Sequence, residues 1–146
     1  MKTPLKGVFN GAFDTVDNIK ISPFSRAYTF SDSVYEVVPF FNSTAIAFDD
    51  HIKRLEFSAS QLAMAVDLKE VIFEINSLIT SSEFSNGYVY YQVTRGVDPL
   101  RSHIHEPNLK TETFGYAKAH LFQWKPLRVS VCDDIRWGRC DIKSTS

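Results

Sequence analysis

Cysteine is scarce in this chain, and its scarcity excludes several kinds of protein. Only two cysteines, Cys132 and Cys140, occur among 146 residues. A small secreted domain that depends on disulfide bonds carries more cysteine than this, and a zinc site built from cysteine alone needs four ligands. We therefore interpret both cysteines as free thiols and expect no metal site.

The sequence also lacks an excess of charge of one sign, a long apolar run and an amino-terminal targeting signal. Its 16 basic and 17 acidic residues give a formal net charge of -1. A protein that binds nucleic acid or an anionic membrane generally needs a basic face, so this balance argues against both partners. No apolar stretch approaches the length of a membrane-spanning helix, and Met1 is not followed by the pattern of a secretion signal. We expect a cytoplasmic protein.

What the chain does contain is enough apolar sequence for one well-packed domain. Hydrophobic residues make up 44% of it, and twelve phenylalanines help to bring the aromatic share to 14%. Alternating apolar residues and turn dipeptides predict an antiparallel sheet. The expected strands are an opening hairpin formed by Val8–Phe13 and Asn18–Ser22, followed by Val34–Phe41, Thr44–Phe48, Tyr88–Arg95, Thr113–Phe122 and Leu127–Cys132.

Helical periodicity replaces this alternation in the middle of the chain. After Asp49 and Asp50, apolar residues are spaced as one face of a helix as far as Val66, and Asp67 can cap a second helix. Strands, then two helices, then strands is typical of an α+β domain with an antiparallel sheet and both helices packed on one side. We expect this small domain to span residues 1–122, with 123–146 forming a linker, a strand and a lysine segment.

The candidate nucleophile is Lys143, near the carboxyl end of the chain. It follows Ile142, and Arg136 and Arg139 lie close to it in sequence. Burial and neighbouring positive charge disfavour an ammonium ion, which would leave a neutral amine able to attack a carbonyl. Taken alone, a solvated surface lysine is the more common interpretation of such a segment.

Further candidates also have simpler interpretations. Tyr35 lies on an expected strand, where an aromatic residue commonly belongs to a core or an interface. Arg54 lies in the first turns of an expected helix, where a solvated side chain is ordinary. Arg101 and His103 lie in a long loop, and loops of this length are usually functional or mobile. His103 and His105 are poor evidence for a metal site, because no clear third ligand accompanies them.

Four motifs, in order along the chain, contain these candidates. They read D-S-V-Y-E-V around Tyr35, H-I-K-R-L around Arg54, R-G-V-D-P-L-R-S-H up to His103, and D-I-R-W-G-R-C-D-I-K-S around Lys143. Together they resemble the motifs of class IV pyridoxal phosphate enzymes, most closely those of the D-amino acid aminotransferases, over roughly residues 26–144. One departure is that serines stand at 31 and 33, where the family has glycine. Serine tolerates a positive φ poorly, so the backbone of this turn could differ.

The resemblance implies a cofactor, pyridoxal 5'-phosphate, and three residues that bind it. Lys143 would carry the cofactor and move the Cα proton of the substrate. Arg54 would hold the phosphate, to which a planar guanidinium is well suited. Trp137 would line the cofactor pocket. The fold implied is the small N-terminal domain of the fold type IV enzymes, followed by the start of their large domain.

The resemblance also assigns the substrate site to Tyr35, Arg101 and His103. These side chains would bind the substrate carboxylate, because a bidentate guanidinium with a second donor selects a carboxylate over an uncharged group. In the family, part of this clamp comes from the partner subunit, so we expect a homodimer. The implied reaction is transamination between a D-amino acid such as D-alanine and a 2-keto acid such as 2-oxoglutarate.

Members of the family continue for about as many residues again beyond the lysine. That second half supplies the carboxylate that protonates the pyridine nitrogen and most of the donors around the phosphate. We therefore expect the 146-residue chain to be inactive by itself. A branched-chain aminotransferase and an aminodeoxychorismate lyase are the alternatives within the class. A non-catalytic domain that only dimerises or binds a partner is the alternative outside it.

Overall fold

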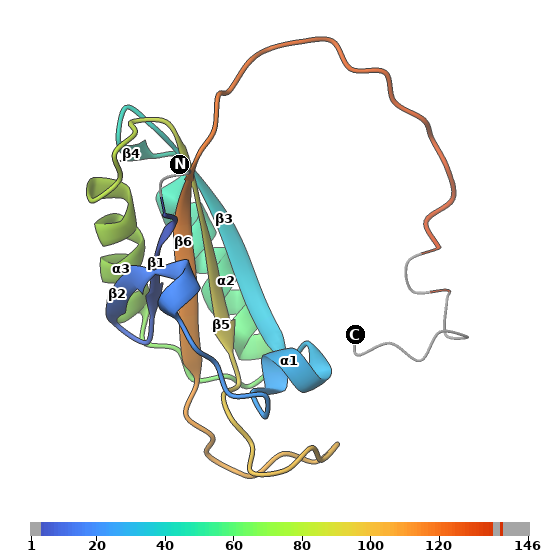
Figure 1. The fold of residues 1–146 in the computed structure, drawn as a ribbon. Coiled ribbons are helices and arrows are strands. Elements are labelled where there is room, and N and C mark those ends of the chain that lie inside the picture. Colours follow the sequence, from blue (N-terminus) through green and yellow to red (C-terminus); the bar gives the residue numbers. More distant parts are fainter. Residues whose placement is uncertain (1–3, 136–137, 139–146) are drawn as a thin grey trace.

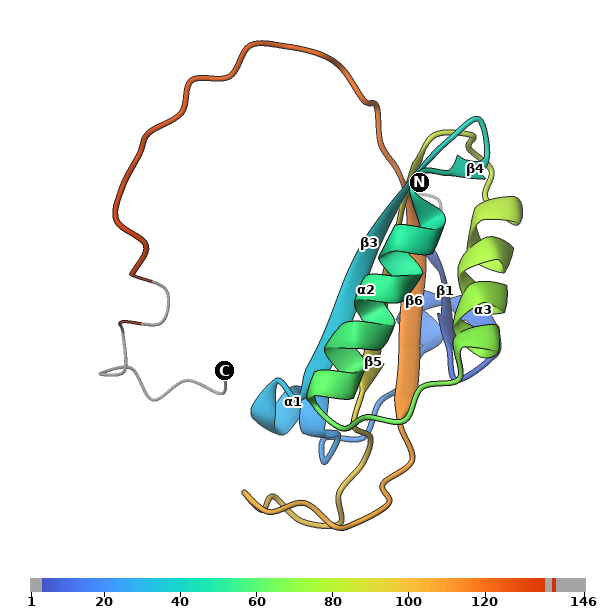
Figure 2. The same ribbon diagram turned by 180° about the vertical axis from the view of Figure 1, so that it is seen from behind.

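The computed structural model describes residues 4–135 and 138, and it contains a six-stranded antiparallel sheet with two helices on one face (Figures 1 and 2). The strands lie side by side in the order β2-β1-β6-β5-β3-β4. Their bounds are β1 Lys6–Phe9, β2 Ala12–Thr15, β3 Ser33–Phe41, β4 Thr44–Ala45, β5 Gly87–Thr94 and β6 Glu112–Ala119. The helices are α1 Arg26–Phe30, α2 Phe48–Gln61 and α3 Leu68–Thr80, with a 3-10 turn η1 at Val16–Asn18. The predicted α+β class, with its antiparallel sheet and helices on one side, is confirmed.

The opening hairpin forms, but with a different second strand from the one predicted. Asn10 and Gly11 both have positive φ, 49° and 81°, which is the geometry of a two-residue hairpin turn. In a two-residue turn the second strand begins directly after the turn. β1 therefore pairs with β2 and not with the expected Asn18–Ser22. The prediction for 18–22 is wrong because a tight turn leaves no residues for a longer connection.

The predicted alternation along β3 is confirmed. Val34, Glu36 and Val38 are buried against the helices, whereas Tyr35 and Val37 face away from them. Pro39, which has no backbone N–H to donate, lies in a strand with only the two-residue β4 on its outer side. The strand expected at Thr44–Phe48 is shorter than predicted: Ala47 has a φ of 50°, which ends the extended backbone, and Phe48 begins α2.

The two long helices begin near the expected residues, and the first ends early. Asp67 caps α3 by accepting hydrogen bonds from the backbone N–H groups of Lys69 and Glu70, at 2.9 and 3.3 Å, as predicted. The helix expected to reach Val66 ends at Gln61, and Ala63 has a left-handed φ of 50°, which interrupts the helix. None of the helices in the described residues is long and apolar enough to cross a membrane.

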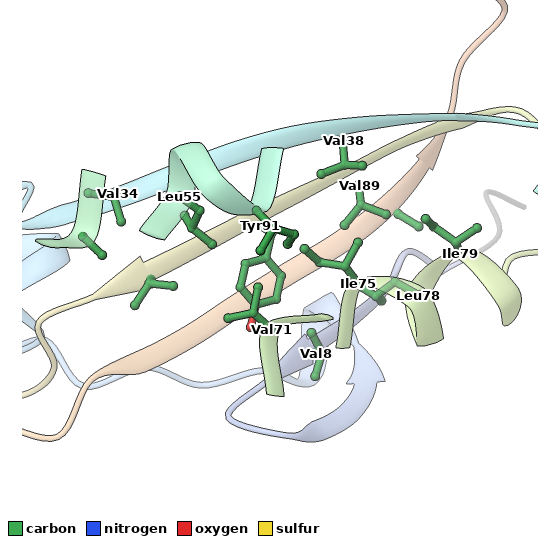
Figure 3. Close-up of a cluster of buried hydrophobic side chains, with 14 of the residues drawn as sticks. Val8, Val34, Val38, Leu55, Val71, Ile75, Leu78, Ile79, Val89 and Tyr91 are labelled. Carbon is green, nitrogen blue, oxygen red and sulfur yellow. The ribbon is translucent and has the colours of Figure 1, made fainter. Parts of the chain in front are cut away.

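The core lies between the two long helices and the sheet (Figure 3). Figure 3 shows Leu55 of α2 and Ile75 and Leu78 of α3 packed over Val89 and Tyr91 of β5. All five of these side chains are at most 1% exposed. The opposite face of the sheet has no helix layer within the described residues, so its side chains are available to form a site.

After β6 the chain leaves the sheet, and the strand expected at Leu127–Cys132 is not formed (Figures 1 and 2). Val129 and Val131 are 80% and 98% exposed, and no described strand lies beside them. Their apolar alternation suits a strand, but a strand is stabilised by hydrogen bonds to a neighbour, which this part of the structure does not provide. Cys132 in the same segment is a free, exposed thiol. The boundary at residue 122 stays a prediction.

Candidate functional site

Two of the predicted substrate residues, Arg101 and His103, lie in a loop at the end of the sheet where β5 ends and β3 begins. Ser33 pairs with Thr94 at this end, so α1, which precedes β3, lies beside the loop of residues 95–111 that follows β5 (Figures 1 and 2). The loop is attached there by an isolated bridge between Ser25 and Val97. Sheet register therefore brings together two segments that lie far apart in the sequence.

In the turn between α1 and β3, one residue has a left-handed backbone conformation although it is a serine and not a glycine. Ser31 has a φ of 53° and forms the carboxyl cap of α1 by donating its backbone N–H to Ala27 O. Ser33, by contrast, lies in the extended backbone of β3. The serine at 31 thus accepts a conformation that costs a side chain about 1–2 kcal/mol, which shows that the surrounding structure fixes this turn.

A buried network of charged side chains fixes the start of the loop. Arg26 donates from Nε to Asp32 at 2.9 Å and from Nη1 to Asp98 at 3.1 Å, and Arg95 donates to Asp32 at 2.6 and 3.1 Å. Burial by itself raises the pKa of Asp32, but the hydrogen bonds and charges of Arg95 and Arg26 outweigh it and hold that pKa below its usual value. The positive charges of the two arginines are therefore neutralised by the negative charges of the two aspartates.

Arg101 and His103 both lie against the ring of Phe30, the last residue of α1. The guanidinium carbon of Arg101 is 4.3 Å from the centroid of that ring, and the His103 ring meets it edge-on at 5.5 Å between centroids. Ser102, between them, accepts a 2.8 Å hydrogen bond from Arg26 Nη1 through its backbone carbonyl. The two residues predicted from the resemblance to bind a carboxylate thus share one surface.

Tyr35 lies on the open face of the sheet in a row of stacked tyrosines. Its ring is 5.5 Å from that of Tyr90, which lies 5.5 Å from Tyr116, each pair with an interplanar angle of 24°. Tyr90 donates to Gln92 Oε1 at 2.7 Å. Burial and the neighbouring Tyr116 and Tyr35 raise the pKa of Tyr90 above its ordinary value. Tyr35 is 63% exposed, so it can reach a ligand on this face.

Arg54 forms a two-point ion pair with Glu36. Its Nε and Nη2 donate to the two oxygens of the Glu36 carboxylate at 2.5 and 2.7 Å, and His51 Nδ1 lies 2.7 Å from Glu36 Oε2. Burial raises the pKa of Glu36, but the hydrogen bonds from Arg54 and His51 outweigh this effect and lower the pKa below its usual value. The same hydrogen bond raises the pKa of Arg54.

The exposed side of Arg54 suits a phosphate. Its side chain is 65% exposed, and within the described residues the Nη1 nitrogen donates to no protein acceptor. A guanidinium whose Nε and Nη2 are fixed by a carboxylate presents its remaining N–H groups in a defined plane, which is the geometry that phosphate oxygens accept. The donor set present here therefore fits the phosphate group of the expected cofactor.

The structure brings some of the predicted residues together and separates others. Arg101 and His103 both contact Phe30. Tyr35 and Glu36 project from opposite faces of β3, because neighbouring residues of a strand alternate, so Arg54 of α2, which binds Glu36, lies on the other side of the sheet from Tyr35. Lys143 and Trp137 lie outside the described residues. His105 only approaches the neighbouring Glu106 carbonyl, at 2.8 Å, and the described residues contain no cluster of three or more potential metal ligands.

Sequence reasoning missed the residues that support the site, namely Arg26, Phe30, Asp98 and Glu36. One signal was available: the alternation of β3 placed Glu36 on a buried face, and a buried carboxylate requires a partner. Arg26 and Asp98 gave no such signal, because nothing local indicates that two residues so far apart in sequence form an ion pair.

Among proteins of known function, the chain is similar to a D-alanine aminotransferase of Staphylococcus haemolyticus. It is 32% identical to this chain over 145 residues, which are 95% of this chain and 51% of the relative. The chain thus spans about half the length of the curated relatives it matches.

Solved structures share the fold at lower sequence identity. The branched-chain amino acid aminotransferase from Escherichia coli superposes with a TM-score of 0.72 at 18% identity, covering 81% of this chain and 42% of that one. The 4-amino-4-deoxychorismate lyase of Pseudomonas aeruginosa gives a TM-score of 0.67 at 18% identity, covering 77% and 39%.

The family is shown by a family model that matches more than half of the chain. The model described as amino-transferase class IV matches residues 33–146, which include β3, both long helices and the loop that carries Arg101. Enzymes of this class use pyridoxal phosphate and act on amino acids and keto acids. As the four motifs predicted, the chain belongs to the class IV aminotransferases.

Proposed function

We propose that this chain provides the carboxylate-binding and phosphate-binding residues of a D-amino acid aminotransferase that transfers the amino group of a D-alanine-like substrate to a 2-keto acid such as 2-oxoglutarate. The observation that carries the proposal is the meeting of Arg101 and His103 on Phe30. A guanidinium and an imidazole that contact the same ring can together provide several N–H donors for the two oxygens of a carboxylate.

The electrostatics of the loop support a carboxylate ligand. Arg26 and Arg95 are paired with Asp32 and Asp98, whereas Arg101 makes no ion pair in the part of the chain that the structure describes. Its positive charge is therefore available for an incoming anion. Tyr35 can add a hydroxyl donor from the open face of the sheet, as predicted from its motif.

The cofactor residues are proposed from the same resemblance and from the geometry of Arg54. Arg54 would bind the cofactor phosphate, Trp137 would line the cofactor pocket, and Lys143 would carry the cofactor and transfer the Cα proton. Bound pyridoxal phosphate supplies the electron sink that makes the Cα proton of an amino acid acidic. The task of this chain is to bind the phosphate, orient the carboxylate and move the proton.

We propose a homodimer in which part of each carboxylate-binding set of Tyr35, Arg101 and His103 comes from the partner subunit. The exposed position of Arg101 and the stacked tyrosines on the open face are compatible with a partner surface. Sedimentation of the protein isolated from its host would test this assembly, and a monomer at assay concentrations would contradict it.

The decisive experiment is a transamination assay on the protein isolated from its own host. D-alanine with 2-oxoglutarate should yield pyruvate, and Lys143→Ala should abolish the product. Arg101→Gln should raise the KM for D-alanine, whereas Arg128→Gln, at an exposed position away from the clamp, should leave it unchanged. Turnover of L-leucine or aminodeoxychorismate instead of D-alanine would support the alternatives within the class. No turnover and no pyridoxal phosphate binding would support a non-catalytic domain.

A further inference from the structure

Phe30 contacts three cationic or ionisable side chains at once. Its ring lies 4.4 Å from the guanidinium carbon of Arg26 and 4.3 Å from that of Arg101, and the His103 ring meets it at 5.5 Å. The ring itself is half-buried at the end of α1. One aromatic side chain therefore contacts both Arg26 of the buried charge network and the two loop residues, Arg101 and His103, that we propose to bind the carboxylate.

The backbone of the loop is anchored independently of this ring. Arg26 N donates to Gly96 O at 2.9 Å, Asp98 N donates to Phe24 O at 3.2 Å, and Arg26 Nη1 donates to Ser102 O at 2.8 Å. These bonds fix the main chain on both sides of residue 100. They do not fix the directions of the Arg101 and His103 side chains, which project from the anchored backbone.

The ring contact is what restrains those two side chains. In the described part of the chain, neither Arg101 nor His103 makes a side-chain hydrogen bond or ion pair, and the Phe30 ring is the one ring contact of each. A guanidinium that lies over an aromatic face keeps its N–H groups free, because they lie in its own plane and point outward. Contact with Phe30 therefore limits motion without occupying the donors that a carboxylate needs.

We propose that Phe30 is a positioning residue that aligns Arg101 and His103 as one carboxylate-binding pair. This inference rests on the proposed function, and it adds a residue that does not itself touch substrate. Pre-alignment of donors improves binding by reducing the ordering that a ligand must impose. Loss of two ring contacts should weaken binding of the carboxylate by about 5- to 20-fold, with little effect on phosphate binding at Arg54.

Phe30→Leu is the test variant, because leucine keeps an apolar side chain at this position and removes the aromatic face. Phe30→Tyr restores a ring and should rescue the wild-type behaviour. Phe13→Leu is the matched control, since Phe13 is also a partly exposed phenylalanine in a ring pair, with Phe73, at the opening hairpin. Melting curves of all three variants would verify that each one folds.

The first measurement uses NMR on the 146-residue chain and does not require catalysis. Phe30→Leu should shift the side-chain signals of Arg101 and His103 because the ring current is removed. Titration with pyruvate, a simple keto acid, should then perturb the His103 signals at concentrations about 5- to 20-fold higher than in the wild type. Phe30→Tyr and Phe13→Leu should titrate like the wild type.

The second measurement uses steady-state kinetics on the protein isolated from its host. Phe30→Leu should raise the KM for D-alanine, change kcat by less than about twofold, and leave pyridoxal phosphate affinity unchanged. An unchanged pyruvate titration or an unchanged KM in Phe30→Leu would overturn the positioning role. If the wild type lacks transaminase activity, the proposed function fails, and the pyruvate titration still decides whether Phe30 aligns the pair.

Discussion

Replacing Tyr91 by phenylalanine should weaken the fold by removing one hydroxyl from a buried cluster. Glu74 of α3 is fully buried, and its carboxylate accepts hydrogen bonds from the backbone N–H of Gly11 at 2.6 Å, from Thr113 Oγ1 at 3.3 Å and from the Tyr91 hydroxyl. Burial, together with the adjacent carboxylate, raises the pKa of Tyr91 far above its ordinary value, so this hydroxyl remains a donor. In Figure 3 the Tyr91 ring lies within the core, close to Val71.

The size of the effect follows from the donors that remain. Phenylalanine keeps the ring, so packing changes little, but Glu74 is left with Gly11 and Thr113 as its donors in a site without solvent. A hydrogen bond to a charged group contributes about 1.5–3 kcal/mol, so the free energy of unfolding should fall by about 2 kcal/mol. For a domain of this size, the melting temperature should then fall by about 6–10 °C.

Urea unfolding followed by circular dichroism measures this change. The slope m should be unchanged, which would show that the variant loses stability and not compactness. Tyr90→Phe is the matched control: its hydroxyl donates to Gln92 on the open face, where water can replace it, so the loss should be below about 1 kcal/mol. Equal losses for Tyr91→Phe and Tyr90→Phe would refute the claim that Tyr91 stabilises a buried carboxylate.

Three further predictions concern the turn, the loop and the response to acid. Ser31→Gly should stabilise the fold by about 0.5–1 kcal/mol because φ is positive there, whereas Ser33→Gly, within β3, should destabilise it; thermal melts distinguish the two. Gly96→Ala should lower the melting temperature sharply, because φ is 104° and the new Cβ would collide with the backbone oxygen of Lys110. Since the pKa of Glu36 is lowered from 4.5, its stabilising effect is present above that pH and is lost as pH falls through the folded-state pKa. The stability difference between wild type and Glu36→Gln should therefore shrink in urea titrations below about pH 4.5.

Local features of the fold could be predicted from sequence because neighbouring residues determine them. Asp67 caps a helix through bonds to residues two and three positions later. The Asn10-Gly11 turn depends on which residues tolerate positive φ, and the two faces of β3 follow from its alternation. The same reasoning failed for Leu127–Cys132, because alternation indicates a strand only where a partner strand is present.

The arrangement of the site could be predicted only in part. The motifs suggested Arg101 and His103 as a pair, but not the ring on which they meet, because Phe30 is remote from them in sequence and reaches them only through the pairing of β3 with β5. Arg26 was missed for the same reason. Its three acceptors on Asp32, Asp98 and Ser102 come from both sides of that strand pair. The roles of all the predicted site residues stay predictions, namely Lys143, Trp137, Arg54, Tyr35, Arg101 and His103.

The position of β1 beside β6 has a consequence for how the protein is made. Gly7 pairs with Tyr116, and Asn10 exchanges hydrogen bonds with Thr113, so the first strand depends on the last. A ribosome adds on the order of 5–20 residues per second, so the opening hairpin waits on the order of 5–20 s before its neighbour exists. During that interval the edge of β1 that will face β6 has no strand to pair with, so its backbone N–H and C=O groups are open to pairing with other chains.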